Sequence, residues 1–167
     1  MAFVRTTYQF KLYKPRNGGG GCASSWDFST KNQCVFVEMA KQNVANDDNG
    51  NTTFDWKSPL RVKLGVSDIG EIMSVLEKRQ NGVGALPDTH GKHKGLFHRN
   101  DKGNVVLSFD TGQTTGFSIR ISSKKKNDKD PVALSHSITN GEACVLLSLL
   151  RAAIVSIYKW NATIQEQ

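Results

Sequence analysis

Two histidines separated by two residues, His90 and His93, are the first candidates for chemistry, because imidazoles at short spacing can bind a metal ion. They lie in a glycine-rich segment with no cysteine or carboxylate cluster beside them. A zinc ion needs further protein ligands of these kinds. We therefore favour a solvated loop at this pair over a metal site.

Two other segments have residue types that bind ions elsewhere. Asp47 and Asp48 lie in an asparagine-rich stretch, where aspartate accepts local backbone hydrogen bonds in turns. The glycine run Gly18–Gly21 is not followed by a helix start or by a Lys-Ser/Thr pair, so it does not match a phosphate-binding loop. We interpret both segments as turns.

The cysteines and the short catalytic motifs also give no active site. The chain has three cysteines, an odd number, without a Cys-x-x-Cys spacing: Cys22, Cys34 and Cys144. This pattern argues against a disulfide framework and favours a reducing compartment. The sequence contains no nucleophile elbow, P-loop or zinc-protease helix motif. We therefore predict a protein that is not an enzyme and that has no metal and no cofactor.

Composition points to a soluble protein with a polyanionic partner. The chain has 167 residues, 22% of them charged and 38% hydrophobic, which fits one folded domain. Its formal net charge is +7 and its isoelectric point is about 9.4. Such an excess of positive charge favours nucleic acid or an acidic membrane surface.

The positive charge is concentrated in two parts of the chain and alternates there with aromatic residues. Residues 1–16 contain four basic residues and no acid, and residues 92–126 contain eight basic residues and two acids. Tyr8, Phe10 and Tyr13 surround Lys11, while Phe97 and His98 lie between Lys94 and Arg99. On an open sheet, cations hold phosphates and rings stack on unpaired bases.

Seven of these residues are our candidates for nucleic-acid contact. They are Lys11, Tyr13, Lys14, Lys94, Phe97, Arg99 and Arg120. Because alternate residues of a strand point to opposite faces, some of the aromatic residues must instead pack in the core. For Trp26, Trp56 and Trp160 the sequence leaves both roles open, and Lys124–Lys126 is either a solvated run or a phosphate contact.

An internal repeat organises the chain, which matches itself at an offset of 71 residues. Asp68–Glu71 aligns with Thr139–Glu142, and in each the first residue can cap a helix while the glutamate reaches back to it. The strand-like segments 31–37 and 60–64 align with 102–108 and 131–135. We predict one domain, 1–167, with repeats at about 3–82 and 92–162.

Hydrophobic periodicity predicts an α+β fold in which each repeat has four antiparallel strands and one helix. The expected strands are Thr6–Lys14, Ala23–Phe28, Gln33–Ala40, Leu60–Gly65, Lys94–Arg99, Asn104–Asp110, Gly116–Ser122 and Val132–Ser135. The expected helices are Ser67–Arg79 and Asn140–Trp160, and exposed linkers are expected at 18–21, 43–51, 81–91 and 124–130.

The two predicted helices differ in how their apolar residues are distributed. The first has a single apolar stripe, whereas apolar residues surround most of the second. Its apolar stretch Ala143–Tyr158 is broken by Arg151 and falls short of a bilayer span of about 20 residues. We therefore expect a helix that is buried, has no membrane role, and drives self-association because a small domain cannot cover all its sides.

Two stretches of the chain carry a family resemblance. In the first half, Phe54-Asp55-Trp56-Lys57 precedes a strand and the helix start Ser67-Asp68-Ile69-Gly70. In the second, Ile138-Thr139 begins a helix that runs through Val145-Leu146-Leu147-Ser148 to Trp160. These segments resemble the Whirly family of single-stranded DNA-binding proteins. Of that family's Lys-Gly-Lys-Ala-Ala-Leu strand motif, only Lys11 is matched.

The resemblance implies a binding protein for single-stranded DNA with little sequence specificity, acting in DNA protection, replication, recombination or transcription. It further implies a homotetramer with the Asn140–Trp160 helices at its centre. Because kinetoplastid mitochondrial RNA-binding proteins share this fold, RNA binding and annealing is an alternative. A protein-interaction module that uses an exposed sheet edge is another. We expect the protein in the cytoplasm or nucleoid of a bacterium or phage-infected cell, or in an organelle after processing.

Overall fold

The alternation of polar and apolar residues produces eight strands, and each group of four is followed by a helix. The computed structural model describes residues 8–84 and 89–160. The elements are β1 (Phe10–Lys14), β2 (Cys22–Ser29), β3 (Cys34–Lys41), β4 (Leu60–Leu64), α1 (Val66–Leu76), β5 (Leu96–Asn100), β6 (Gly103–Thr111), β7 (Phe117–Lys125), β8 (Val132–Ile138) and α2 (Asn140–Tyr158). Every predicted strand and helix is present, and the start of the expected strand Thr6–Lys14 lies outside the described residues.

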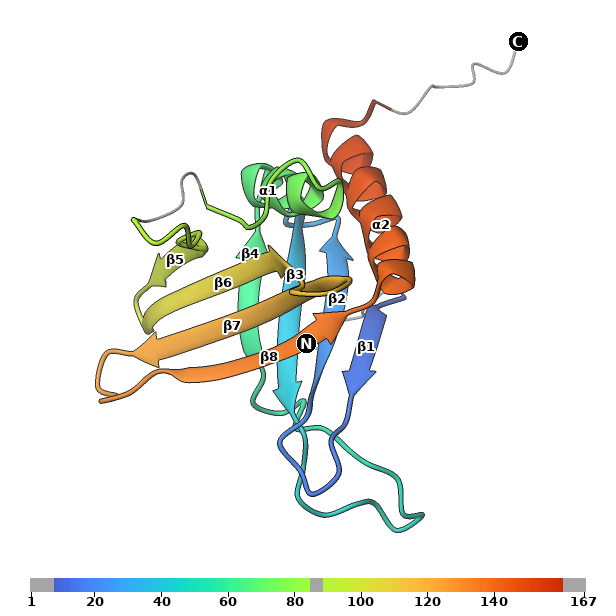
Figure 1. Cartoon of the computed structure of the whole chain (residues 1–167), viewed down its shortest axis with the longest axis vertical. Helices are drawn as coiled ribbons and strands as arrows, with labels where there is room; N and C mark the ends of the chain where they lie inside the picture. The colour runs from blue at the N-terminus through green and yellow to red at the C-terminus, as the bar shows by residue number, and fades with distance from the viewer. Residues whose placement is uncertain (1–7, 85–88, 161–167) are drawn as a thin grey trace.

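The strands form two antiparallel four-stranded sheets. Their orders are β1-β2-β3-β4 and β5-β6-β7-β8, so each strand pairs with its neighbours in sequence. The strands of the second sheet cross those of the first (Figure 1). Helices α1 and α2 contact each other. This arrangement confirms the predicted fold class of two repeats, each with four strands and a helix.

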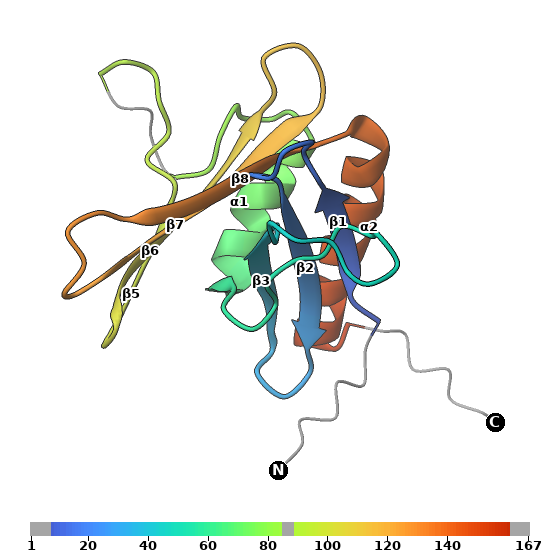
Figure 2. The ribbon, with the colours of Figure 1, turned by 90° about the horizontal axis from the view of Figure 1, so that it is seen from below.

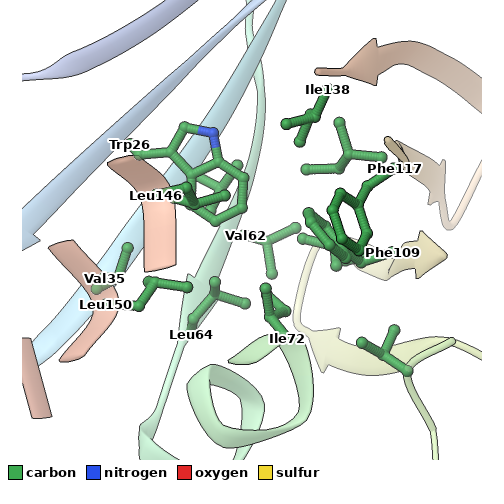
Figure 3. Packing of buried hydrophobic residues seen from close by; sticks show 14 of the residues in the cluster. Trp26, Val35, Val62, Leu64, Ile72, Phe109, Phe117, Ile138, Leu146 and Leu150 are labelled. Atoms are coloured by element: carbon green, nitrogen blue, oxygen red, sulfur yellow. The ribbon is translucent and has the colours of Figure 1, made fainter. Parts of the chain in front are cut away.

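The core lies between the inner faces of the two sheets and the helices. Trp26 on β2 meets Phe109 on β6 edge-on, with ring centres 6.4 Å apart. Phe109 in turn stacks on Phe117 of β7 at 6.0 Å. Val62 from β4 and Leu146 from α2 surround these rings (Figure 3). Burying each side chain of this size contributes about 1.5–3 kcal/mol to stability, so the core fixes how the two sheets pack.

The helix starts confirm one predicted cap and correct the other. Thr139 caps α2, and Glu142 reaches back to the Thr139 amide at 2.8 Å, as predicted. In α1 the cap is Gly65, and it is Asp68 that accepts from the Gly65 amide at 3.1 Å. Asp68 therefore corresponds to Glu142 rather than to Thr139. The predicted alignment was wrong at this point because acidic residues occur at two positions near the start of α1.

The expected linkers are not all exposed. Gly21 is buried, and a side chain there would clash with the Lys14 carbonyl oxygen, so the close approach of the backbone requires glycine. Val83 is completely buried, and its amide donates to the Phe109 carbonyl at 3.1 Å. The start of the expected linker 81–91 is thus part of the core, because it pairs with β6.

Helix α2 is only partly buried. Ala143, Leu146, Leu150 and Ala153 pack into the core, and the opposite side is exposed. Arg151, which breaks its apolar stretch, pairs with Glu77 after α1 at 2.7 Å. By length and composition alone α2 could cross a membrane, although core helices of soluble proteins meet the same criteria. The expectation of a buried helix is therefore correct for one side of α2. The other side is exposed, as predicted for a domain too small to cover the whole helix.

Candidate nucleic-acid interface

The outer face of the second sheet presents an aromatic ring beside a cation. In β5, Leu96 points inward and is buried, whereas Phe97 and Arg99 point outward and are exposed. The Phe97 ring is 62% exposed, so it is free to stack on a base. His98 points to the inner side instead, where it lies 3.3 Å from Asp68 of α1.

Strand register brings two more cations to this face. Arg99 pairs with Asn104 on β6, and Asn104 pairs with Lys124 on β7. Arg120 occupies the same face of β7, opposite Ser108. Arg99, Arg120 and Lys124 are all exposed. The sheet thus places three cations on the same face as Phe97, and rings with cations on one face are the combination that stacks a base and holds phosphates.

The remaining outward positions of β5–β8 are mostly small and polar. They include five serines: Ser108, Ser118, Ser122, Ser135 and Ser137. Asp110 is the single acid among these outward positions, and burial raises the pKa of its carboxyl while nearby His93 lowers it. Hydroxyl groups donate hydrogen bonds to phosphate and sugar oxygens without selecting a base. This surface, the β5–β8 face, suits a polyanionic chain.

Two further predicted residues lie at the ends of the strands. Lys94 is exposed and precedes β5 by one glycine, Gly95, where a side chain would meet the Leu107 carbonyl oxygen at 2.9 Å. Lys94 thus lies next to β5 in sequence, just before a position that requires glycine. Lys14 ends β1 and lies on the inner side, where its ammonium group is 2.7 Å and 2.8 Å from the two carboxylate oxygens of Glu142.

The outer face of the first sheet holds the other two predicted residues. Lys11 and Tyr13 point outward from β1, and both are exposed. The Lys11 ammonium group lies 5.2 Å from the centre of the Trp56 ring. The Tyr13 ring lies 5.6 Å from that of Phe54. The four residues form one group, which we call the Trp56 cluster.

Sequence reasoning did not name Phe54 as a contact residue, and it left Trp56 open between packing and ligand contact. They lie between β3 and β4, in a segment that returns to β1 because Phe54 bridges to Gln42 and the Asp55 amide donates to the Lys41 carbonyl at 2.8 Å. A signal was available, since an aromatic pair at two-residue spacing precedes β4. Lys124 was left open between solvent and phosphate, and the register places it on the β5–β8 face.

The histidines and acids form no candidate metal centre. Among residues 8–84 and 89–160, no group of three or more histidine, cysteine, aspartate or glutamate side chains could hold a metal ion. His93 is hydrogen-bonded through Nδ1 to the Gly84 carbonyl at 3.0 Å. Asp47 accepts backbone hydrogen bonds from Asn49 and Asn51, which is the turn role predicted for it.

Solved structures share this architecture. WHY3 of Arabidopsis thaliana matches with a TM-score of 0.65 at 17% identity, over 93% of this chain and 91% of that protein. The chain has the Whirly fold. MRP1/MRP2 of Trypanosoma brucei matches with a TM-score of 0.65 at 13% identity, over 92% and 86% of the two chains. A guide RNA-binding protein complex solved with its guide RNA matches with a TM-score of 0.60 at 12% identity, over 95% and 94%.

No protein-family model matches the sequence, and no curated protein matches it. The identities to the solved structures are low, so the shared feature is the Whirly fold itself. The residues on the outer faces of this chain must therefore be interpreted from their own chemistry.

Proposed function

We propose that this protein binds single-stranded nucleic acid with little sequence specificity. The observation that carries the proposal is the exposed Phe97 ring, with Arg99 beside it and Arg120 and Lys124 on the same face of the sheet. The ring stacks on an unpaired base, and the cations hold phosphates on either side of it. Every base has a stackable face, so such a site selects single strands without selecting a sequence.

The Whirly fold supports this function independently of the residues. One of the structures that shares it is a guide RNA-binding protein complex bound to its RNA, and another is a plant transcriptional regulator. The net charge of +7 supports it too. We propose single-stranded DNA as the main ligand, used in DNA protection, replication, recombination or transcription, with RNA as the alternative polymer.

We also propose that the protein works as a homotetramer assembled through α2. Val145 and Leu149 lie one turn apart on the exposed side of that helix and are 48% and 46% exposed. Beside them a pocket of about 390 Å³ opens between α2 and the first sheet, lined by Phe10, Trp26 and Leu149 among others. A second copy of α2 would remove this apolar surface from water.

Fluorescence anisotropy tests the function directly. Labelled single-stranded DNA, duplex DNA and single-stranded RNA of about 30 nucleotides, enough for several binding sites, are titrated with the protein at moderate salt. We expect clearly tighter binding of a single strand than of the duplex, and the ratio of DNA to RNA affinity identifies the polymer. Equal affinity for duplex, or no binding of any polymer, would contradict the proposal and favour a protein partner.

A further inference from the structure

The two outer faces of the molecule differ in chemistry. The outward positions of β5–β8 carry three cations, one acid and a single ring, that of Phe97. Those of β1–β4 carry three cations and two acids, so their charges nearly balance. Four rings gather on that second surface: Tyr13, Phe36, Phe54 and Trp56.

The two surfaces also point in different directions. The inner faces of both sheets meet in the core, where Trp26 contacts Phe109, so the outer faces lie on opposite sides of the packed sheets (Figure 2). One short oligonucleotide stretched over the β5–β8 face therefore does not cover the Trp56 cluster. Any ligand of that cluster is held by a separate site.

One of the two outward acids of the first sheet is neutralised by a neighbouring cation. Glu38 is buried and forms an ion pair with Arg61, whose guanidinium also lies 5.7 Å from the centre of the Phe36 ring. Near the rings Lys11, Lys57 and Lys63 are exposed, whereas Asp27 and Asp55 are only partly exposed. The surface attracts phosphate weakly and offers apolar rings.

The rings are accessible to a base. Tyr13 is 53% exposed, and Phe54 and Trp56 are half-buried. The Lys11 ammonium group that lies over Trp56 belongs to an exposed side chain, so it can move to a phosphate. A cation–π contact at an exposed site is weaker than a base stacked on a ring. Replacing the Lys11 ammonium group over Trp56 by a base is therefore favourable.

We propose that the Trp56 cluster is a second nucleic-acid subsite, which binds unpaired bases by stacking on Trp56 and Tyr13 and depends little on phosphate contacts. The proposal rests on the proposed single-strand function. It adds to the β5–β8 face a surface of different character on the opposite side of the chain.

Tryptophan fluorescence reports on this subsite. Trp26 is 4% exposed and Trp160 is 83% exposed, so in a Trp160→Phe variant Trp56 is the more exposed of the two remaining tryptophans. We expect unlabelled single-stranded DNA to quench the fluorescence of this variant and duplex DNA to leave it unchanged. Anisotropy with labelled DNA, recorded on the same samples, measures binding independently of the rings.

Two variants complete the test. Trp56→Ala and Tyr13→Ala should each weaken single-strand binding about 5- to 150-fold, as loss of a stacked base does, and leave the slope of log K against log salt unchanged. Tyr13→Ala decides the question if Trp56→Ala does not fold, because Tyr13 lies at the surface. Anisotropy that shows binding without quenching, or wild-type affinity in folded variants, would overturn the second subsite alone. Absence of binding by anisotropy would overturn the proposed function itself.

Discussion

Nε2 of His136 on β8 lies 2.8 Å from Oγ of Ser24 on β2, and this hydrogen bond joins the two sheets inside the molecule. Nδ1 of His136 lies 2.8 Å from the Ser137 carbonyl oxygen, which can only accept, so Nδ1 carries a proton. In the neutral ring Nε2 then accepts from the Ser24 hydroxyl. The Trp26 ring nitrogen donates to the same hydroxyl at 3.3 Å. These contacts fit a neutral imidazole, and burial favours that form by lowering the pKa of His136.

We predict that stability falls as the pH drops below about 6.5. Burial lowers the pKa of His136, and Lys14 lowers it further, while the Ser137 carbonyl and Glu142 oppose the shift. The unfolded chain then takes up a proton at a higher pH than the folded chain, so the stabilisation is complete above the unfolded pKa and is lost below it. Urea unfolding at pH 7.5 and 5.5 measures the loss. His136→Asn should reduce this pH dependence, and an unchanged dependence would contradict the assignment.

The ion pair between Lys14 and Glu142 gives a prediction about stability. Burial raises the pKa of Glu142, but the Lys14 ammonium group and the Thr139 amide lower it to a greater extent, so the net shift is downward. The two side chains are 24% and 28% exposed. We expect Lys14→Met to lower the free energy of unfolding by about 1 kcal/mol at pH 7.

The same variant separates two roles for Lys14. Lys14 is one of the contacts predicted from the sequence. If its ammonium group stays paired with Glu142 when nucleic acid binds, Lys14→Met leaves the salt slope of binding unchanged. A shallower slope in binding titrations would instead show that the lysine leaves Glu142 for a phosphate.

The phosphate contacts of the β5–β8 face are tested through salt dependence. Each phosphate contact to a single strand contributes about −0.7 to the slope of log K against log salt. Removing both Arg120 and Lys124 by alanine substitution should therefore make the slope shallower by about 1.4. Lys31→Ala, at the exposed turn between β2 and β3, removes one cation away from this face as a control and should leave the slope unchanged. If Lys31→Ala made the slope shallower by as much per charge as the Arg120 and Lys124 substitutions do, the cations would act through the overall charge of the protein rather than through phosphate contacts.

Self-association through α2 is tested by placing a charge on its exposed side. Leu149→Glu should convert a tetramer into smaller species, because a carboxylate in an apolar interface carries a high desolvation cost. Val44→Glu, at a site that is 97% exposed between β3 and β4, is the control. Light scattering coupled to size-exclusion chromatography gives the mass. A wild-type monomer, or a tetramer that survives Leu149→Glu, would contradict the proposed interface.

The strands and the α2 cap could be predicted because both are local. Period-two alternation defines which side of β5 is core, and it separates Phe97 from His98 once the strand is known. The Thr139–Glu142 box requires only a three-residue spacing. The start of α1 was harder to predict, since its cap is glycine and has no side-chain signal.

The rest depends on contacts between distant parts of the chain. Lys14 pairs with a residue 128 positions away, and no spacing rule relates them. Trp56 reaches Lys11 only because the segment after β3 turns back to the first strand. Lys124 joins Arg99 through two strand registers. These relationships are set by tertiary packing, so the sequence could propose the residue types of the site but not its two surfaces.

The measurement that tests the central claim most directly is the affinity of Phe97→Ala for single-stranded DNA, measured by anisotropy beside the wild type and Val44→Ala. Phe97 is exposed, so its loss should not affect folding. We predict that Phe97→Ala binds a single strand about 5- to 150-fold more weakly, that its duplex affinity changes little, and that Val44→Ala binds like the wild type. A Phe97→Ala variant that is folded and binds single strands with wild-type affinity would contradict the account.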